Sequence, residues 1–208
     1  MTYPSKVQAV YAAQTQDDQK VAYDDWAQTY EQELMAMGYR IPALMAALFV
    51  RHVPDVRTSI LDAGCGGGLQ AEPLKLLGYQ NITGLDLSEG MLKIAETKDI
   101  YQRLVQHSLG NGLPFNPNTF GVTLSCGTIT QGHAPPSSFQ DLIDVTKPGG
   151  KIIFTLRDDP DIDPAYNQAV QHHLDQGHWK LIERTVPTAT MPYGEPEVLH
   201  RGWVMEVV

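Results

Sequence analysis

Apolar positions near the start of the chain recur at the spacing of an α-helix. They lie mostly three or four residues apart, close to one face: Val21, Trp26, Tyr30, Leu34 and Met37. This pattern predicts a helix over residues 21–37, which Gly38 ends. A second helix is expected over residues 41–52, with Pro42 in its first turn.

From residue 58 onward, short apolar runs alternate with helical stretches. Strands are predicted at 59–63, 81–87, 104–109, 122–125 and 151–156, and β-like stretches at 179–190 and 202–208. Helices are predicted between them at 69–77, 89–98, 138–145 and 163–176. This alternation is typical of a parallel α/β sheet with helices on both faces. Such sheets bind ligands at the carboxyl ends of their strands.

Composition narrows the class of function. The 208 residues include 15 Lys and Arg against 24 Asp and Glu, which gives a formal net charge of −9. That sign disfavours nucleic-acid backbones and anionic membrane surfaces as partners. The N-terminus is polar, no apolar run reaches the roughly 20 residues of a membrane span, and the two cysteines are far apart. We therefore expect a soluble, cytoplasmic protein without a membrane partner.

The strongest local motif is the glycine-rich segment 60–68, Ile-Leu-Asp-Ala-Gly-Cys-Gly-Gly-Gly. Glycines at a strand end let the backbone approach a ligand closely, and the following helix supplies unpaired N–H groups. A plain turn needs only one or two glycines. The dinucleotide pattern G-x-G-x-x-G fits poorly, because Leu69 occupies the third glycine position when Gly64 leads. The spacing that fits is acid-x-Gly-x-Gly-x-Gly: Asp62, Gly64, Gly66 and Gly68.

This spacing resembles the first motif of the class I S-adenosylmethionine-dependent methyltransferases. Further segments agree with that family in order and spacing: Asp86 at the end of the second strand, Leu113-Pro114-Phe115 with Asn118-Thr119-Phe120 before the fourth, and Lys147-Pro148-Gly149-Gly150 before the fifth. Together these motifs cover residues 60–154. Segments 23–25, 39–42, 101–104 and 145–150 are also similar to the methyltransferase-like protein 27 group, a resemblance that covers most of the chain.

The resemblance implies a fold and a cofactor. The fold would be a Rossmann-like, seven-stranded sheet with helices on both faces and an antiparallel last strand. Residues 1–57 would form an N-terminal helical lid and residues 58–208 the cofactor-binding domain, in one compact unit. The cofactor would be S-adenosyl-L-methionine (SAM), with S-adenosyl-L-homocysteine (SAH) as the product and no metal.

The resemblance also implies which residues hold the cofactor. Backbone groups of Gly64, Cys65 and Gly66 would face its methionine part, Asp62 would anchor the loop or meet the ammonium group, and Asp86 would accept both ribose hydroxyls. The other candidates are Gly68, Leu87, Met91, Ser108, Leu109, Gly110, Ser125, Tyr23, Tyr30 and Arg40. Leu87 and Met91 would pack on adenine, and Arg40 would pair with the methionine carboxylate. Leu109 stands where the family commonly has an Asp for the adenine amino group. Backbone at Leu109 and Gly110, or Ser108, would then recognise adenine.

The loop after the fourth strand would face the methyl acceptor. It lacks the Asn/Asp-Pro-Pro-aromatic motif of many amino-directed methyltransferases. His133 is the candidate general base on this loop, since an unperturbed imidazole has a pKa of about 6.5, although an ordinary exposed loop histidine is the alternative. Tyr30 is the second candidate catalytic residue.

The expected function is direct methyl transfer to a small-molecule acceptor, by a monomer or weak homodimer with no nucleic-acid partner. Two alternatives remain open from the sequence. One is a protein or peptide methyltransferase, and the other is a non-catalytic module that binds SAM or SAH.

Overall fold

The structure is a computed structural model that describes residues 9, 10, 12, 13 and 15–208. Its first long helix is α2, Gln16–Ala36, which begins five residues before the predicted start because Thr15 and Asp18 form a capping box. Each of these residues accepts the other's backbone N–H with its side chain, at 3.1 Å. Helix α3, Ile41–His52, has the predicted bounds.

In the described part of the chain, eight strands form one sheet. They are β1 Ile60–Ala63, β2 Ile82–Asp86, β3 Arg103–Gln106, β4 Phe120–Ser125, β5 Thr146–Arg157, β6 Trp179–Arg184, β7 Thr188–Ala189 and β8 Leu199–Val207. The order is β3-β2-β1-β4-β5-β8-β6, with the short β7 paired to β8. Strands β1 to β5 are parallel, and β8 is antiparallel to both β5 and β6. The predicted sheet with an antiparallel last strand is therefore confirmed, with β7 as an additional two-residue strand.

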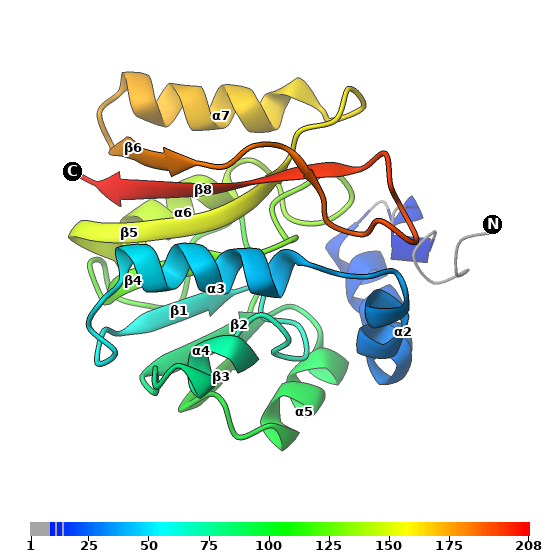
Figure 1. Cartoon of the computed structure of the whole chain (residues 1–208). Helices are drawn as coiled ribbons and strands as arrows, with labels where there is room; N and C mark the ends of the chain where they lie inside the picture. The colour runs from blue at the N-terminus through cyan, green and yellow to red at the C-terminus, as the bar shows by residue number, and fades with distance from the viewer. Residues whose placement is uncertain (1–8, 11, 14) are drawn as a thin grey trace.

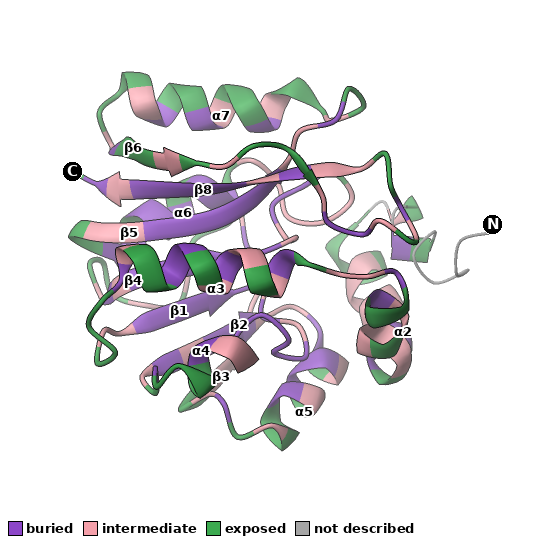
Figure 2. Ribbon diagram, in the orientation of Figure 1, coloured by how far each residue is buried: buried purple, intermediate pink, exposed green. Residues whose placement is uncertain are grey.

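Helices cover both faces of the sheet, with α3 in front of it and α6 behind it in Figure 1. The remaining helices are α4 Glu72–Leu76, α5 Glu89–Thr97, α6 Ser138–Val145 and α7 Pro164–Asp175. Every residue of β1 is buried, and β1, β4 and β8 are almost entirely buried in Figure 2. Continuous burial is expected for central strands that have helices on both sides.

The core is divided by the sheet into two layers. Phe154 packs with Phe139 of α6 and Trp179 on one side, whereas its neighbour Ile153 packs with Phe49 of α3 on the other. This alternation follows from the two-residue period of a strand. It makes the sheet a rigid platform for the turns at the carboxyl ends of the strands.

Several predicted boundaries differ from the structure, and two of these differences have a clear physical reason. Helix α4 begins at Glu72 rather than at residue 69, because the chain first turns at Gly68 and because Pro73 is favoured in a first turn. Strand β5 begins at Thr146, five residues early, because Thr146 pairs with Phe120 before a register shift at Val122. The difference at β5 depends on pairing between strands, which the local pattern does not contain.

Within the described residues, no single helix is long and apolar enough to cross a membrane. The bent pair α2 and α3, with 82° between them, meets that test together, by length and composition alone. The described part of the chain also holds no group of three or more His, Cys, Asp or Glu side chains arranged to bind a metal ion.

Candidate active site

A cleft of about 790 Å³, counting its open mouth, lies at the carboxyl ends of β1, β2, β3 and β4. This is the edge where open α/β sheets bind ligands. Its walls come from α2 and from the turns that follow the four strands. The lining includes Gln16, Gln19, Tyr23 and Tyr30 of α2 and residues 64–67, 69, 70, 85–87, 91, 107–109, 126–128, 133 and 134.

The glycine loop after β1 forms the floor of the cleft. Gly64 has a φ of +79°, and a Cβ there would lie 2.3 Å from Cγ2 of Thr128, so the position accepts no side chain. Gly66 also has a positive φ, +52°, but a Cβ there would meet no atom within 4 Å. The Gly66 backbone therefore borders open space, as a ligand cradle requires.

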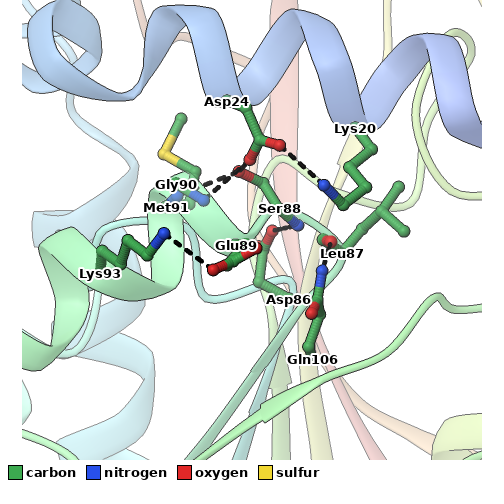
Figure 3. Close-up of polar contacts among 10 residues, drawn as sticks. All are labelled: Lys20, Asp24, Asp86, Leu87, Ser88, Glu89, Gly90, Met91, Lys93 and Gln106. Carbon is green, nitrogen blue, oxygen red and sulfur yellow. Dashed lines mark hydrogen bonds and ion pairs between the residues drawn. The ribbon is translucent and has the colours of Figure 1, made fainter.

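Asp86, at the end of β2, is held by two backbone amides. Gly66 donates its N–H to Oδ2 at 2.8 Å, and Ser88 donates its N–H to Oδ1 at 2.9 Å (the Ser88 contact is drawn in Figure 3). Burial raises the pKa of Asp86, and the amides of Ser88 and Gly66 counteract part of that rise. Each carboxylate oxygen keeps a further lone pair, so the fixed carboxylate can accept a pair of neighbouring hydroxyls.

Asp62 lies beneath the loop rather than in the cleft. Its side chain is fully buried, and it accepts hydrogen bonds from the Tyr101 hydroxyl at 2.7 Å and from the Gln70 amide at 3.4 Å. Gln70 also donates to the carbonyls of Gly64 and Cys65, at 3.2 and 3.1 Å. Burial raises the pKa of Asp62 to about 7, against the opposing effect of these hydrogen bonds. Of the two roles expected for Asp62, this geometry supports loop anchoring.

The opposite end of the cleft is apolar. Leu109 is buried and lines the cleft together with Leu87 and Met91, which forms a slot suited to a flat ring. Gly110 does not line the cleft, and its N–H donates to Oδ2 of Asp141 at 2.6 Å. The Gly110 N–H is therefore already bound within the protein. Leu109 and Ser108 are the adenine candidates that line the cleft.

A second cavity of about 640 Å³, also counting its open mouth, adjoins the cleft. Four residues line both spaces and so mark their junction: Tyr23, Tyr30, Gly127 and His133. Much of the remaining lining is apolar and comes from α2, from the start of α3 and from the segment before β8. It includes Trp26, Leu34, Met37, Ile41, Met191 and Val198, with Thr130, Arg157, Glu195 and His200 as polar members.

The imidazole of His133 is oriented at this junction. Its Nδ1 lies 3.2 Å from the Gln131 carbonyl, which can only accept, so Nδ1 carries the hydrogen and Nε2 of the neutral ring is an acceptor. Burial lowers the pKa of His133, and the charge of Arg157 lowers it further, whereas the Gln131 carbonyl raises it. A neutral imidazole whose Nε2 is an acceptor is the form that a general base needs.

Comparison with known proteins assigns the family. A family model described as a methyltransferase domain matches residues 61–154, which run from β1 into β5. The chain is also 35% identical, over 165 residues, to methyltransferase-like protein 27 of Homo sapiens, an alignment that covers 76% of this chain and 66% of the relative. The chain belongs to the class I S-adenosylmethionine-dependent methyltransferases.

Other relatives of this methyltransferase carry names with different substrates. The chain is 30% identical over 118 residues to a ubiquinone biosynthesis O-methyltransferase of Chromobacterium violaceum, covering 50% of this chain and 47% of the relative. It is 30% identical over 123 residues to the 18S rRNA (guanine(1575)-N(7))-methyltransferase of Saccharomyces cerevisiae, covering 53% of this chain and 45% of that relative. The chain thus spans about half the length of these two relatives, and family membership leaves the acceptor undetermined.

Solved structures agree on the fold of the methyltransferase. Magnesium protoporphyrin IX methyltransferase of Synechocystis PCC 6803, solved with bound SAM, superposes with a TM-score of 0.63 over 98% of this chain and 90% of that one. The two sequences are 15% identical, so the likeness shows the shared fold alone.

The cleft of the methyltransferase fits SAM, the cofactor of its family. The exposed backbone at Gly66 leaves room for the methionine part, the fixed carboxylate of Asp86 suits the ribose diol, and the slot at Leu87, Met91 and Leu109 suits adenine. These three features follow β1, β2 and β3, which are neighbours in the sheet.

Several predicted cofactor residues lie elsewhere. Ser125 is buried at the end of β4, donates to the Ala63 carbonyl at 3.0 Å and does not line the cleft. Arg40 is exposed at the turn into α3 and lines neither cavity, and its backbone N–H donates to the Thr190 carbonyl. Gly68 forms the tight turn out of the loop and also lies outside the lining. The expected pairing of Arg40 with the methionine carboxylate is therefore not supported.

Four residues that organise the methyltransferase site were missed. Gln70 holds the loop carbonyls, Asp141 holds the turn at Gly110 and Gly112, and Asp24 and Gln19 fasten α2 across the cleft. Gln70 stands two residues after the last loop glycine, and this closeness to the motif is a local signal for its role. The other three lie 29 or more residues from these partners, and the sequence holds no local signal for them.

Proposed function

We propose that this protein is an enzyme that methylates a small-molecule acceptor held in the second cavity. The observation that carries the proposal is the junction of the two cavities. Tyr23, Tyr30, Gly127 and His133 border both spaces, so a cofactor in the cleft and an acceptor in the second cavity would meet there. Transfer between two bound molecules requires this kind of shared boundary.

The residues of the chain divide the work of binding and alignment. When bound, SAM supplies a methyl group on a cationic sulfur, already activated for direct displacement. Asp86 would hold the ribose, the glycine loop would hold the methionine part, and Leu109 would cover the adenine. Helix α2 shields the junction from water through Tyr23 and Tyr30, which lowers the number of competing nucleophiles.

His133 is the residue that we propose as the general base. Its Nε2 would take the proton that a hydroxyl acceptor loses as its oxygen bonds to the methyl carbon. Tyr23 limits the motion of the imidazole, because the two rings lie edge to face with centroids 5.8 Å apart. Tyr30 packs 4.7 Å from Trp26, centroid to centroid, and would position the acceptor rather than exchange protons with it.

The lining of the second cavity favours a small, largely apolar acceptor. Trp26, Leu34, Met37 and Ile41 contribute buried apolar surface to this cavity. The net charge of −9 disfavours RNA, even though one relative is named for rRNA. The apolar lining also agrees with the quinone-pathway name of another relative.

Transfer of labelled methyl groups tests the proposal. The protein is incubated with methyl-labelled SAM in three separate reactions, which contain a metabolite extract, a protein extract or total RNA. We expect label in small products of the metabolite extract only, and its loss in Asp86→Ala. Label confined to polypeptide or RNA would contradict the small-molecule proposal. If the protein binds SAH by calorimetry but transfers no methyl group in any extract, it is a cofactor-binding module without this activity.

A further inference from the structure

The side chain of Asp24, on α2, reaches across to the start of α5. Its Oδ1 accepts a hydrogen bond from the Ser88 hydroxyl at 2.6 Å and another from the Gly90 N–H at 2.8 Å. Its Oδ2 pairs with Lys20, one turn earlier on α2, at 2.8 Å. Figure 3 shows these contacts converging on one carboxylate between the two helices. Asp24 therefore joins α2 to residues that lie 64 and 66 positions further along the chain.

Ser88 connects this carboxylate to the proposed ribose site. Its backbone N–H donates to Oδ1 of Asp86 at 2.9 Å, and its hydroxyl accepts the Met91 N–H at 3.0 Å as the cap of α5. The hydroxyl has a single hydrogen, which is given to Asp24. Ser88 is fully buried, so water does not compete for these bonds. Two hydrogen bonds in series thus link α2 to Asp86 through one residue.

Gly90 lets the two helices approach closely. A Cβ at this position would lie 3.0 Å from Cα and 3.1 Å from Oδ1 of Asp24. Glycine inside a helix is about 0.5–1 kcal/mol less favourable than alanine. The sequence therefore carries a residue that weakens α5 locally where α2 sits against it.

Two other contacts place α2 across the cleft. Beyond Asp24, Glu31 pairs with Lys98 at the end of α5, at 2.5 Å. On the opposite side of the cleft, the side-chain amide of Gln19 donates to the carbonyls of Gly132 and His133, both at 3.0 Å. Helix α2 thus spans the cleft from α5 to the loop after β4, and Asp24 is its attachment nearest to Asp86 along the chain of hydrogen bonds.

We infer that Asp24 is a positioning residue that couples the position of α2 over the cleft to the orientation of the Asp86 carboxylate. This coupling slows release of the cofactor. A cofactor in the cleft would lie against Tyr23 and Tyr30 of α2, so in this inference its release is coupled to an outward movement of α2. That movement breaks both hydrogen bonds of Asp24 and frees the Ser88 hydroxyl beside Asp86. The inference rests on SAM binding in the cleft and is independent of which acceptor is methylated.

The primary measurement is the dissociation rate of SAH from the full chain, followed by displacement with excess SAM in a stopped-flow instrument. For Asp24→Ala we expect an increase of about tenfold, because two hydrogen bonds to a charged group are lost, with little change in the association rate. Asp25→Ala, an exposed neighbour on the same helix, is the matched control and should stay within about twofold of the wild type. A dissociation rate for Asp24→Ala inside that range would overturn the inference.

Gly90→Ala tests the same coupling without removing a carboxylate. The added methyl group opposes the approach of α2 but favours the helical state of α5. We expect faster SAH release with no fall in the melting temperature of the free protein. A purely structural role for this contact predicts the reverse, namely a lower melting temperature and an unchanged release rate. This variant also keeps the inference open to refutation if Asp24→Ala does not fold.

A double-mutant cycle identifies the path of the coupling. If Asp24 acts through Ser88, the release rate of Asp24→Ala combined with Ser88→Ala should be close to that of Ser88→Ala alone. Multiplicative effects of the two substitutions would contradict this path. Because SAH binding is measured without an acceptor, these outcomes do not depend on methyl transfer. Failure of the wild type to bind SAH would instead refute the cofactor site itself.

Discussion

The buried carboxyl of Asp62 makes the stability of this fold depend on pH near neutrality. Burial beneath the glycine loop raises its pKa to about 7, whereas an Asp in an unfolded chain has a pKa of about 3.9. Between these values the folded protein holds a proton that the unfolded chain has released. The stabilising contribution of this group is therefore complete below about pH 4 and is lost as the pH rises through 7.

The size of the effect follows from the two pKa values. Each unit of difference corresponds to about 1.4 kcal/mol, and titration of Asp62 between pH 5 and pH 8 removes about 2 to 3 kcal/mol from the free energy of unfolding. Asp62→Asn removes this titration and keeps one oxygen to accept from the Tyr101 hydroxyl. We expect the stability advantage of the wild type over the variant to shrink by that amount between the two pH values.

Urea unfolding at several pH values, followed by tryptophan fluorescence, measures this difference. Comparison with the variant cancels the titration of groups that both proteins share. Asp161→Asn, an exposed carboxyl in the loop after β5, is the control and should reproduce the pH profile of the wild type. A difference between the wild type and Asp62→Asn that stays constant within about 0.5 kcal/mol would refute the assigned pKa and the burial argument behind it.

Three further predictions concern the cleft. Gly64→Ala should lower the melting temperature and abolish measurable SAH binding by calorimetry, because its methyl group meets Thr128. Gly66→Ala, whose methyl group meets no atom, should weaken SAH binding with a loss of only about 1–2 kcal/mol in stability. Equal losses of stability in the two variants would contradict the difference in free space around these two glycines. His133→Gln should reduce kcat/KM by about 10²–10⁴ once an acceptor is found, while the calorimetric Kd for SAH stays unchanged, and an unaltered kcat/KM would exclude His133 as the base. Asp86→Asn should raise the Kd for SAH at least tenfold, since an amide offers only one accepting oxygen, and an unchanged Kd would remove Asp86 from the ribose site.

Local signals predicted much of the secondary structure. Helix α3 has its predicted bounds, and α5 begins directly after Ser88, whose hydroxyl caps it as expected of a serine in that position. The differences at α4 and β5 come from a turn at Gly68 and from the pairing of Thr146 with Phe120. Hydrophobic period and capping act over a few residues, so they predict the existence of an element better than they predict where long-range pairing ends it.

The sequence by itself determined the sheet architecture, the glycine loop and Asp86, because strand period, glycine spacing and an acid at a strand end are properties of adjacent residues. Only the tertiary structure decided that Asp62 lies under the loop, that Arg40 lies outside the cleft, and that Asp24 binds the start of α5. These placements depend on which side chains meet after α2 folds over the sheet edge. Hydrogen bonds between residues 39 to 66 positions apart leave no periodic trace in a sequence, and for that reason they become visible only in three dimensions.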